Sequence, residues 1–122
     1  MKTNMRLWNL KRSEHSHSSQ FMKTLATVSV MVSLTATVPA TIQSVAKRFQ
    51  RTTLANGEAC VETTEHLLAA LSGLGIDNLY AELSGPELPA GDGSAADYVR
   101  LLRQAGIVEQ DAERPTLRIM EP

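Results

Sequence analysis

The sequence contains a single cysteine, Cys60, so no disulfide bond within one chain can stabilise the fold. A lone cysteine is typical of proteins from a reducing compartment, and it predicts a cytoplasmic location. Cys60 has no histidine or cationic neighbour in the sequence that would favour a reactive thiolate, and we assign it no role. Aromatic residues make up only 4% of the chain, so we expect a core of aliphatic side chains.

The chain also lacks an excess of charge and a long apolar run. Its formal net charge is -1, which gives no electrostatic reason to expect nucleic acid or an anionic membrane as a partner. The most apolar stretch, residues 21–40, is too short and too polar to form an integral membrane segment. A signal peptide remains an alternative because basic residues precede this stretch. Its alternating pattern instead predicts a half-buried strand, carried by Val28, Val30, Val32, Leu34, Ala36 and Val38.

With 122 residues the chain is long enough for one domain with a modest core. Residues 1–20 are polar, with a basic bias and several serines, and we expect them to be disordered. His15 and His17 form a His-x-His pair in this region. We interpret them as solvated side chains, because only Glu14 adjoins them and no further histidine or cysteine is near.

Residues 38–66 are expected to contain two short strands joined by a hairpin turn at Asn56 and Gly57. A small basic cluster precedes this turn at Lys47, Arg48 and Arg51. This cluster could steer a phosphorylated substrate, although solvated side chains at a strand edge are the simpler explanation.

A helix is expected to begin near Glu65. Thr63 and Thr64 offer a hydroxyl N-cap, and a glutamate in the first turn suits the positive end of the helix dipole. An apolar stripe follows at helical spacing, and Gly75 provides the stop. The stripe consists of Leu67, Leu71 and Leu74, and a neighbouring face almost free of bulk consists of His66, Ala69, Ala70 and Gly73.

After this helix the pattern predicts a strand over residues 79–83, an irregular loop over 85–93 and a second helix. Ser94 and Asp97 resemble a capping box at the start of the second helix, and Gly106 ends it. We expect its core-facing side chains to be Val99, Leu102 and Ala105, with Ile107 packing back on the last turn and a final strand over residues 116–120. The order of elements predicts an α+β fold, a small β-sheet with two helices packed on one face.

Glu65 and His66 are the candidate site residues, although a Glu-His pair alone is weak evidence for a site. On the residues alone, His66 is more often an ordinary helix histidine than a ligand or a catalytic group. Neither His-Glu-x-x-His nor its inverse is present, because Glu62 stands where the inverse motif needs a histidine.

Three motifs in succession carry a family resemblance: TTEHLLAALSGLGIDN, then GPELPAGDGSA, then LLRQAGI. Together they resemble the first domain of UDP-3-O-acyl-N-acetylglucosamine deacetylase, the zinc hydrolase of lipid A biosynthesis. The resemblance divides the chain into an unmatched N-terminal segment (1–37), partly disordered with one strand, a first-domain remainder (38–115), and the start of a strand or linker to a second domain (116–122). The family's opening strand-and-turn region is not found in residues 1–37.

The resemblance implies one half of a two-domain β-α-α-β sandwich whose helices meet around a zinc ion. It implies that His66 is a ligand of Zn²⁺ and that Glu65 is the general base, taking a proton from the zinc-bound water that attacks the acetamide. The substrate would be a UDP-linked acylated amino sugar, with substrate-binding residues in this chain unknown. The other metal ligands would come from a second domain, and no histidine follows His66 here.

Two hypotheses follow from this incomplete set of ligands. In the first, the chain is a fragment of a zinc-dependent amide hydrolase, inactive alone and completed by a separate second domain. In the second, it is a stand-alone small α+β binding module, or a remnant without function.

Overall fold

The computed structural model describes residues 5–8, 27–33, 36–47 and 49–110, together with Arg118 and Met120. Two helices are present in this part of the chain, α1 (Glu65–Leu74) and α2 (Ala96–Ala105), with a short 3-10 turn, η1 (Ile42–Ser44). The strands are β1 (Met5–Trp8), β2 (Thr27–Ser33), β3 (Ala36–Pro39), β4 (Val45–Ala46), β5 (Thr53–Asn56), β6 (Ala59–Val61) and β7 (Asn78–Leu83). The expected α+β class is confirmed.

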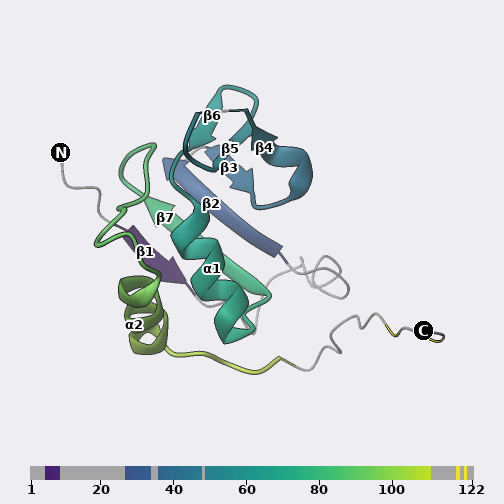
Figure 1. Ribbon diagram of the computed structural model, residues 1–122, viewed down its shortest axis with the longest axis vertical. Coiled ribbons are helices and arrows are strands. Elements are labelled where there is room, and N and C mark those ends of the chain that lie inside the picture. Colours follow the sequence, from purple (N-terminus) through teal and green to yellow (C-terminus); the bar gives the residue numbers. More distant parts are fainter. Residues whose placement is uncertain are drawn as a thin grey trace, which may run out of the picture.

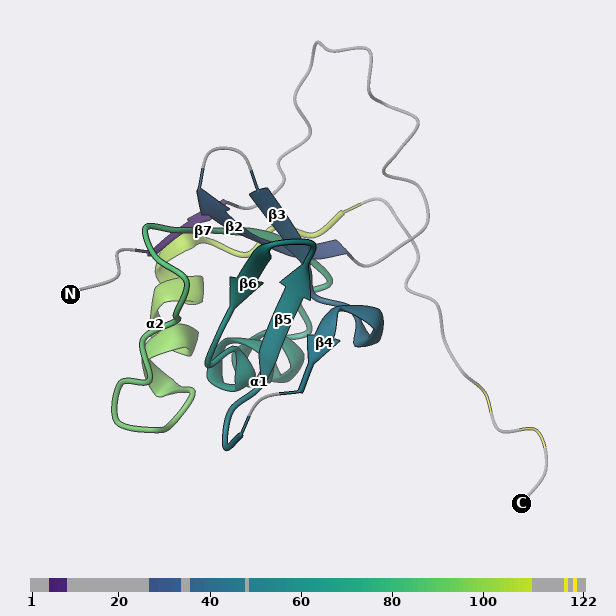
Figure 2. The same cartoon turned by 90° about the horizontal axis from the view of Figure 1, so that it is seen from above.

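Four strands form the larger sheet, in the order β1-β7-β2-β3. The central strands β2 and β7 run parallel, whereas β1 pairs antiparallel with β7 and β3 pairs antiparallel with β2. Both helices lie against one face of this sheet, as the views in Figures 1 and 2 agree. The expected packing of two helices on one face is therefore confirmed.

A second sheet of three strands, β4-β5-β6, was not anticipated as a separate unit. Its hairpin is the one expected from Asn56 and Gly57, with Asn56 paired to Ala59 and Gly57 at a φ of 60°. Because β5 and β6 lie against β3, this small sheet sits beside the larger one and leads directly into α1 (Figure 2).

The single strand expected over residues 28–38 is wrong in its extent, because the chain forms two antiparallel strands there, β2 and β3. Val30 pairs with Val38, and both side chains are buried. A single strand of this length would extend about 36 Å and run past its neighbours. Folding back lets the two arms pair with each other instead.

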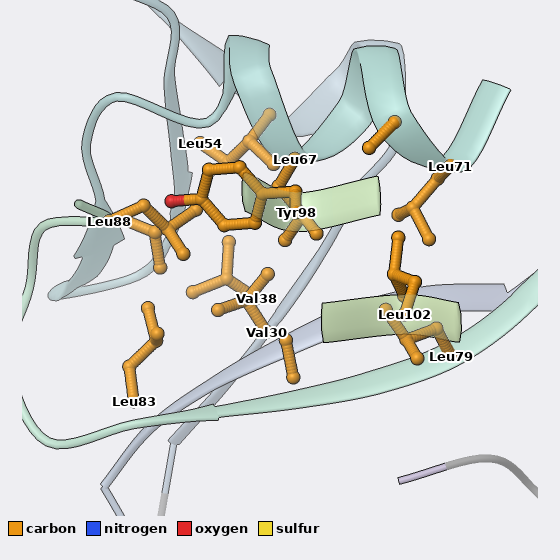
Figure 3. Packing of buried hydrophobic residues seen from close by; sticks show 13 residues of the cluster. Val30, Val38, Leu54, Leu67, Leu71, Leu79, Leu83, Leu88, Tyr98 and Leu102 are labelled. Atoms are coloured by element: carbon orange, nitrogen blue, oxygen red, sulfur yellow. The ribbon is translucent and has the colours of Figure 1, made fainter. Parts of the chain in front are cut away.

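The core is aliphatic, as expected, with one aromatic side chain among its buried members. In β7 the alternation predicted from the sequence is confirmed, because Leu79, Ala81 and Leu83 are all buried. Figure 3 shows Leu79 beside Leu102 of α2, whereas Leu83 lies on the side of the core where Leu88 lies. The cluster consists of Val30, Val38, Leu54, Val61, Leu67, Ala70, Leu71, Leu79, Ala81, Leu83, Leu88, Tyr98 and Leu102.

The N-terminal segment was expected to lack structure up to residue 20, and this is wrong for β1. Met5–Trp8 pairs with Leu83–Tyr80 of β7 and forms the edge of the larger sheet. An unpaired β7 would have exposed its backbone N–H and C=O groups along that edge. His15 and His17 lie outside the described residues.

Helix α1 begins and ends where the sequence predicts. Gly75 at its C-cap has a φ of 66°, and the N–H of Ile76 donates to the carbonyl oxygen of Leu71 at 2.9 Å. On the neighbouring face of small residues, Ala69 and Gly73 are exposed, whereas Ala70 is buried.

Gly73, inside α1, and Gly75, at its C-cap, provide a matched test of this end of the helix. A Cβ added at Gly73 or at Gly75 would meet no atom within 4 Å, so alanine changes only the backbone preference. We expect Gly75→Ala to lower the free energy of unfolding by about 1 kcal/mol, because alanine disfavours a positive φ. Gly73→Ala is expected to raise it by about 0.5 to 1 kcal/mol, because alanine favours a helix interior. Urea denaturation measures both free energies of unfolding. If the two substitutions change them in the same direction, α1 does not end at Gly75.

Helix α2 ends at Ala105 with Gly106 at its C-cap, as expected, but its start and its packing differ from expectation. It begins at Ala96 without a capping box, because the Ser94 hydroxyl accepts the N–H of Ala96 (3.2 Å) while Asp97 pairs with Arg100. Leu102 is buried as expected and Val99 is partly buried, but Tyr98 takes the second buried position and Ala105 is exposed. Ile107 is 49% exposed and does not pack back on the last turn.

The final strand expected over residues 116–120 lies mostly outside the described part of the chain. Arg118 and Met120, which are described, belong to no strand. Each helix is ten residues long, and in the described ranges none is long and apolar enough to cross a membrane.

Candidate active site

Glu65 and His66 stand at the first two positions of α1, where the chain leaves the small sheet. Both side chains are partly buried. Thr64 occupies the N-cap position, but the expected hydroxyl cap is absent, because its hydroxyl turns toward β5 instead. The N-terminus of α1, called its head below, is therefore held in place by another segment of the chain.

That segment ends at Thr52, which contacts the head of α1 through three hydrogen bonds. The carbonyl oxygen of Thr52 accepts from the N–H and from the hydroxyl of Thr64, each at 3.1 Å. The N–H of Thr52 donates to Oε2 of Glu65 at 3.1 Å. Oε1 of Glu65 has no hydrogen bond to any residue that the structure describes. One carboxylate oxygen of Glu65 is thus anchored by the segment that precedes β5.

Thr63, two residues before Glu65, has an unusual backbone conformation with a φ of 59°. A β-branched residue at positive φ costs about 1 to 3 kcal/mol and persists only where its surroundings hold it. Thr63 is 7% exposed, and its hydroxyl donates to Oε1 of Glu87 at 2.9 Å. The turn between β6 and α1 is therefore stabilised from the loop that follows β7.

Glu62 and Arg51 join the same loop to the small sheet. The N–H of Glu62 donates to the carbonyl oxygen of Pro86 at 2.8 Å, and its carbonyl oxygen accepts from the N–H of Leu88 at 3.0 Å. Nη1 of Arg51 lies 2.6 Å from Oε2 of Glu62 and 3.6 Å from Oε1 of Glu87. Of the basic cluster, Arg51 is therefore held in ion pairs, Lys47 is exposed, and Arg48 lies outside the described residues.

The loop after β7 is anchored at Leu88, whose side chain is buried in the core (Figure 3). Further along, the hydroxyl and the N–H of Ser94 both donate to Oδ1 of Asp92, at 2.7 Å and 2.9 Å. These bonds lower the pKa of Asp92, and the positive charge of His66 contributes a smaller effect in the same direction. The start of the segment that leads into α2 is therefore ordered by Asp92.

Tyr98 connects α2 to this loop, because its hydroxyl donates to the carbonyl oxygen of Pro89 at 2.5 Å. Figure 3 places the phenol oxygen on the side of the core where Leu88 lies. Burial raises the pKa of Tyr98 to about 12, and the negative charges of Glu65 and Asp97 act in the same direction. The phenol therefore keeps its proton, and its hydrogen bond, throughout the neutral range.

Tyr98 is expected to make stability depend on pH above 10. In the unfolded chain a tyrosine ionises near pH 10, so this group's contribution is complete below pH 10 and is lost as the pH rises toward about 12. Tyr98→Phe should lower the free energy of unfolding by about 1 kcal/mol at pH 8, where the hydrogen bond is lost. At pH 11 the free energy of unfolding of Tyr98→Phe should differ less from that of the unaltered chain. Urea titrations at both pH values test this, with Tyr80→Phe as the control. If Tyr98→Phe differs from the unaltered chain by the same free energy of unfolding at pH 8 and at pH 11, the raised pKa of Tyr98 is contradicted.

The residues present offer zinc one ligand rather than a complete site. No group of three or more histidine, cysteine, aspartate or glutamate side chains gathers in the described residues in a way that could hold a metal. Catalytic zinc takes three protein ligands, and the imidazole of His66 supplies one donor of the right kind. Cys60 lies on β6 as a free and partly buried thiol, and it belongs to no group of three or more such side chains in the described residues.

The supporting residues Thr52, Thr63, Glu87 and Tyr98 were not identified from the sequence as parts of the site. Thr52 lies 13 residues before Glu65, and Glu87 lies 24 residues after Thr63. Contacts over such separations follow no local spacing rule. The available signal was the loop after residue 83, whose prolines and glycines indicate a defined path.

Comparison of the sequence with known proteins shows the family of this chain. The model of the family described as LpxC, UDP-3-O-acyl N-acetylglycosamine deacetylase, matches residues 11–122. A UDP-3-O-acyl-N-acetylglucosamine deacetylase of Pseudomonas entomophila (strain L48) is 49% identical over 83 residues, which are 68% of this chain and 27% of the relative. The protein of the same name from Thioalkalivibrio sulfidiphilus (strain HL-EbGR7) is 59% identical over 68 residues, 56% of this chain and 22% of the relative.

A third relative of that name, from Legionella pneumophila (strain Corby), is 47% identical over 85 residues, 70% of this chain and 28% of the relative. The chain thus spans about a quarter of the length of these relatives. The family match covers most of the chain, includes the loop after β7 and contains Glu65 and His66. The chain belongs to the LpxC family of UDP-3-O-acyl N-acetylglycosamine deacetylases.

Proposed function

We propose that this chain supplies one half of the active site of a zinc-dependent deacetylase acting on UDP-3-O-acyl-N-acetylglucosamine, and that the other half comes from a second domain. Family membership supports the reaction class. The observation that carries the proposal is the N-terminus of α1. There a carboxylate with one anchored oxygen, and one oxygen bonded to no described residue, precedes a partly buried imidazole.

In this proposal Glu65 is the general base for hydrolysis of the acetamide. The N–H of Thr52 holds Oε2, so Oε1 is the oxygen that accepts a proton from the attacking water. Glu65 is the first residue of α1, directly after the N-cap Thr64. His66 follows it on the helix and contributes one zinc ligand.

The test is reconstitution with a second domain made separately. The part of the Pseudomonas entomophila relative that lies beyond the matched segment is mixed with this chain, zinc and UDP-3-O-acyl-N-acetylglucosamine, and the release of acetate is followed. We expect deacetylation by the mixture and none by either part alone. Absence of activity, with both parts shown to be folded by circular dichroism, would favour a stand-alone binding module instead.

A further inference from the structure

Three segments distant in sequence meet at the turn before α1. Arg51 comes from the segment before β5, Glu62 and Thr63 come from the turn itself, and Glu87 comes from the loop after β7. Oε1 of Glu87 lies 2.9 Å from the Thr63 hydroxyl and 3.6 Å from Nη1 of Arg51. A single carboxylate oxygen of Glu87 therefore contacts both the turn and the segment that leads into β5.

The geometry of this turn determines where the helix begins. Val61 is fully buried at the end of β6, and Leu67 is fully buried in the first part of α1. Between these fixed points the backbone reverses at Thr63, in a conformation that β-branched residues rarely adopt. Such a conformation is kept by its surroundings, and the described contact of the Thr63 side chain is the bond from its hydroxyl to Glu87.

We propose that Thr63 is a positioning residue for Glu65: its hydroxyl bond to Glu87 holds the left-handed turn that keeps the Glu65 carboxylate against the N–H of Thr52. This inference rests on the proposed role of Glu65 as general base. If the bond is lost, the turn relaxes, and the hydrogen bond between Thr52 and Glu65 opens more often. A merely structural role for Thr63 would instead weaken the whole fold evenly.

Amide hydrogen exchange on the chain alone separates these two roles. Thr63→Val keeps the branched shape and removes the hydroxyl, whereas Thr63→Ser keeps the hydroxyl. We expect Thr63→Val to accelerate exchange of the Thr52 N–H about tenfold more than that of the Leu71 N–H in the middle of α1. Thr63→Ser should restore the rate for Thr52 to within about threefold of the unaltered chain.

Two outcomes of the exchange experiment would overturn the proposal. One is equal acceleration at Thr52 and Leu71 in Thr63→Val, which indicates general destabilisation. The other is a Thr63→Ser chain that behaves like Thr63→Val, because the hydroxyl would then not be the cause. If Thr63→Val fails to fold, Glu87→Ala removes the acceptor instead, and the same comparison of amides applies.

The reconstituted enzyme provides a second readout. With the second domain added, Thr63→Val is expected to lower kcat about tenfold with KM unchanged, since the substrate still binds while the base is less often aligned. A change in KM alone would contradict positioning of the base. If the unaltered mixture shows no turnover, the proposed function fails, whereas the exchange rates still decide whether Thr63 holds Glu65.

Discussion

Glu65→Gln is expected to lower kcat of the reconstituted enzyme by about 100- to 10,000-fold, the range typical of a well-placed general base. Glutamine has nearly the same shape, and its side-chain oxygen can still accept the N–H of Thr52. It cannot take a proton from water, so the chemical step alone is affected. Steady-state rates of acetate release provide the measurement.

Glu58→Gln is the matched control, because Glu58 is exposed in the hairpin between β5 and β6. It makes the same chemical change without touching the head of α1, and kcat is expected to stay within about twofold of the unaltered value. Equal rates for the two variants would show that Glu65 is not the base, even in a mixture that deacetylates the substrate.

Leu67→Ala is expected to lower the free energy of unfolding by about 2 to 5 kcal/mol. Leu67 is completely buried beneath the first turn of α1, where its side chain lies among the core residues drawn in Figure 3. Truncation removes apolar contacts and leaves a cavity. Domains of this size unfold with a total of only about 5 to 15 kcal/mol, so the loss is a large share of the stability. Urea denaturation followed by circular dichroism measures it.

Leu101→Ala is the control for this substitution, because Leu101 lies on α2 and is 38% exposed. The same atoms are removed where water already reaches them, and the expected loss is about 1 kcal/mol or less. Similar losses in the two variants would be inconsistent with the packing of α1 on the larger sheet.

Helix α1 and strand β7 could be predicted because local patterns determine them. The leucines of α1 recur at helical spacing, Gly75 supplies the conformation that ends it, and β7 alternates buried and half-exposed side chains. The break between β2 and β3 could not be predicted in this way. The alternation of residues 28–38 is the same in one long strand and in two short ones, and pairing across the hairpin decides between them.

The candidate site also contains residues that the sequence identifies and residues that only the structure shows. Glu65 and His66 were identified through the family resemblance of their motif, and their own spacing carries little information. The residues that hold them lie in other segments, because Thr52 leads into β5 and Glu87 lies beyond β7. Tyr98 was missed because the helical pattern fits Val99 nearly as well. Tyr98 is buried more deeply than Val99 because its hydroxyl bonds to the carbonyl oxygen of Pro89, which gives the buried phenol a partner.

Zinc stoichiometry tests most directly the proposal that this chain carries one part of a divided metal site. Equilibrium dialysis followed by metal analysis is carried out on the chain alone, on a His15→Ala, His17→Ala variant, and on the chain mixed with the second domain. We predict well below one tightly bound zinc ion per chain alone, one per reconstituted pair, and loss of that ion in His66→Ala. One tightly bound ion on the chain alone, retained when His15 and His17 are replaced, would contradict the proposal.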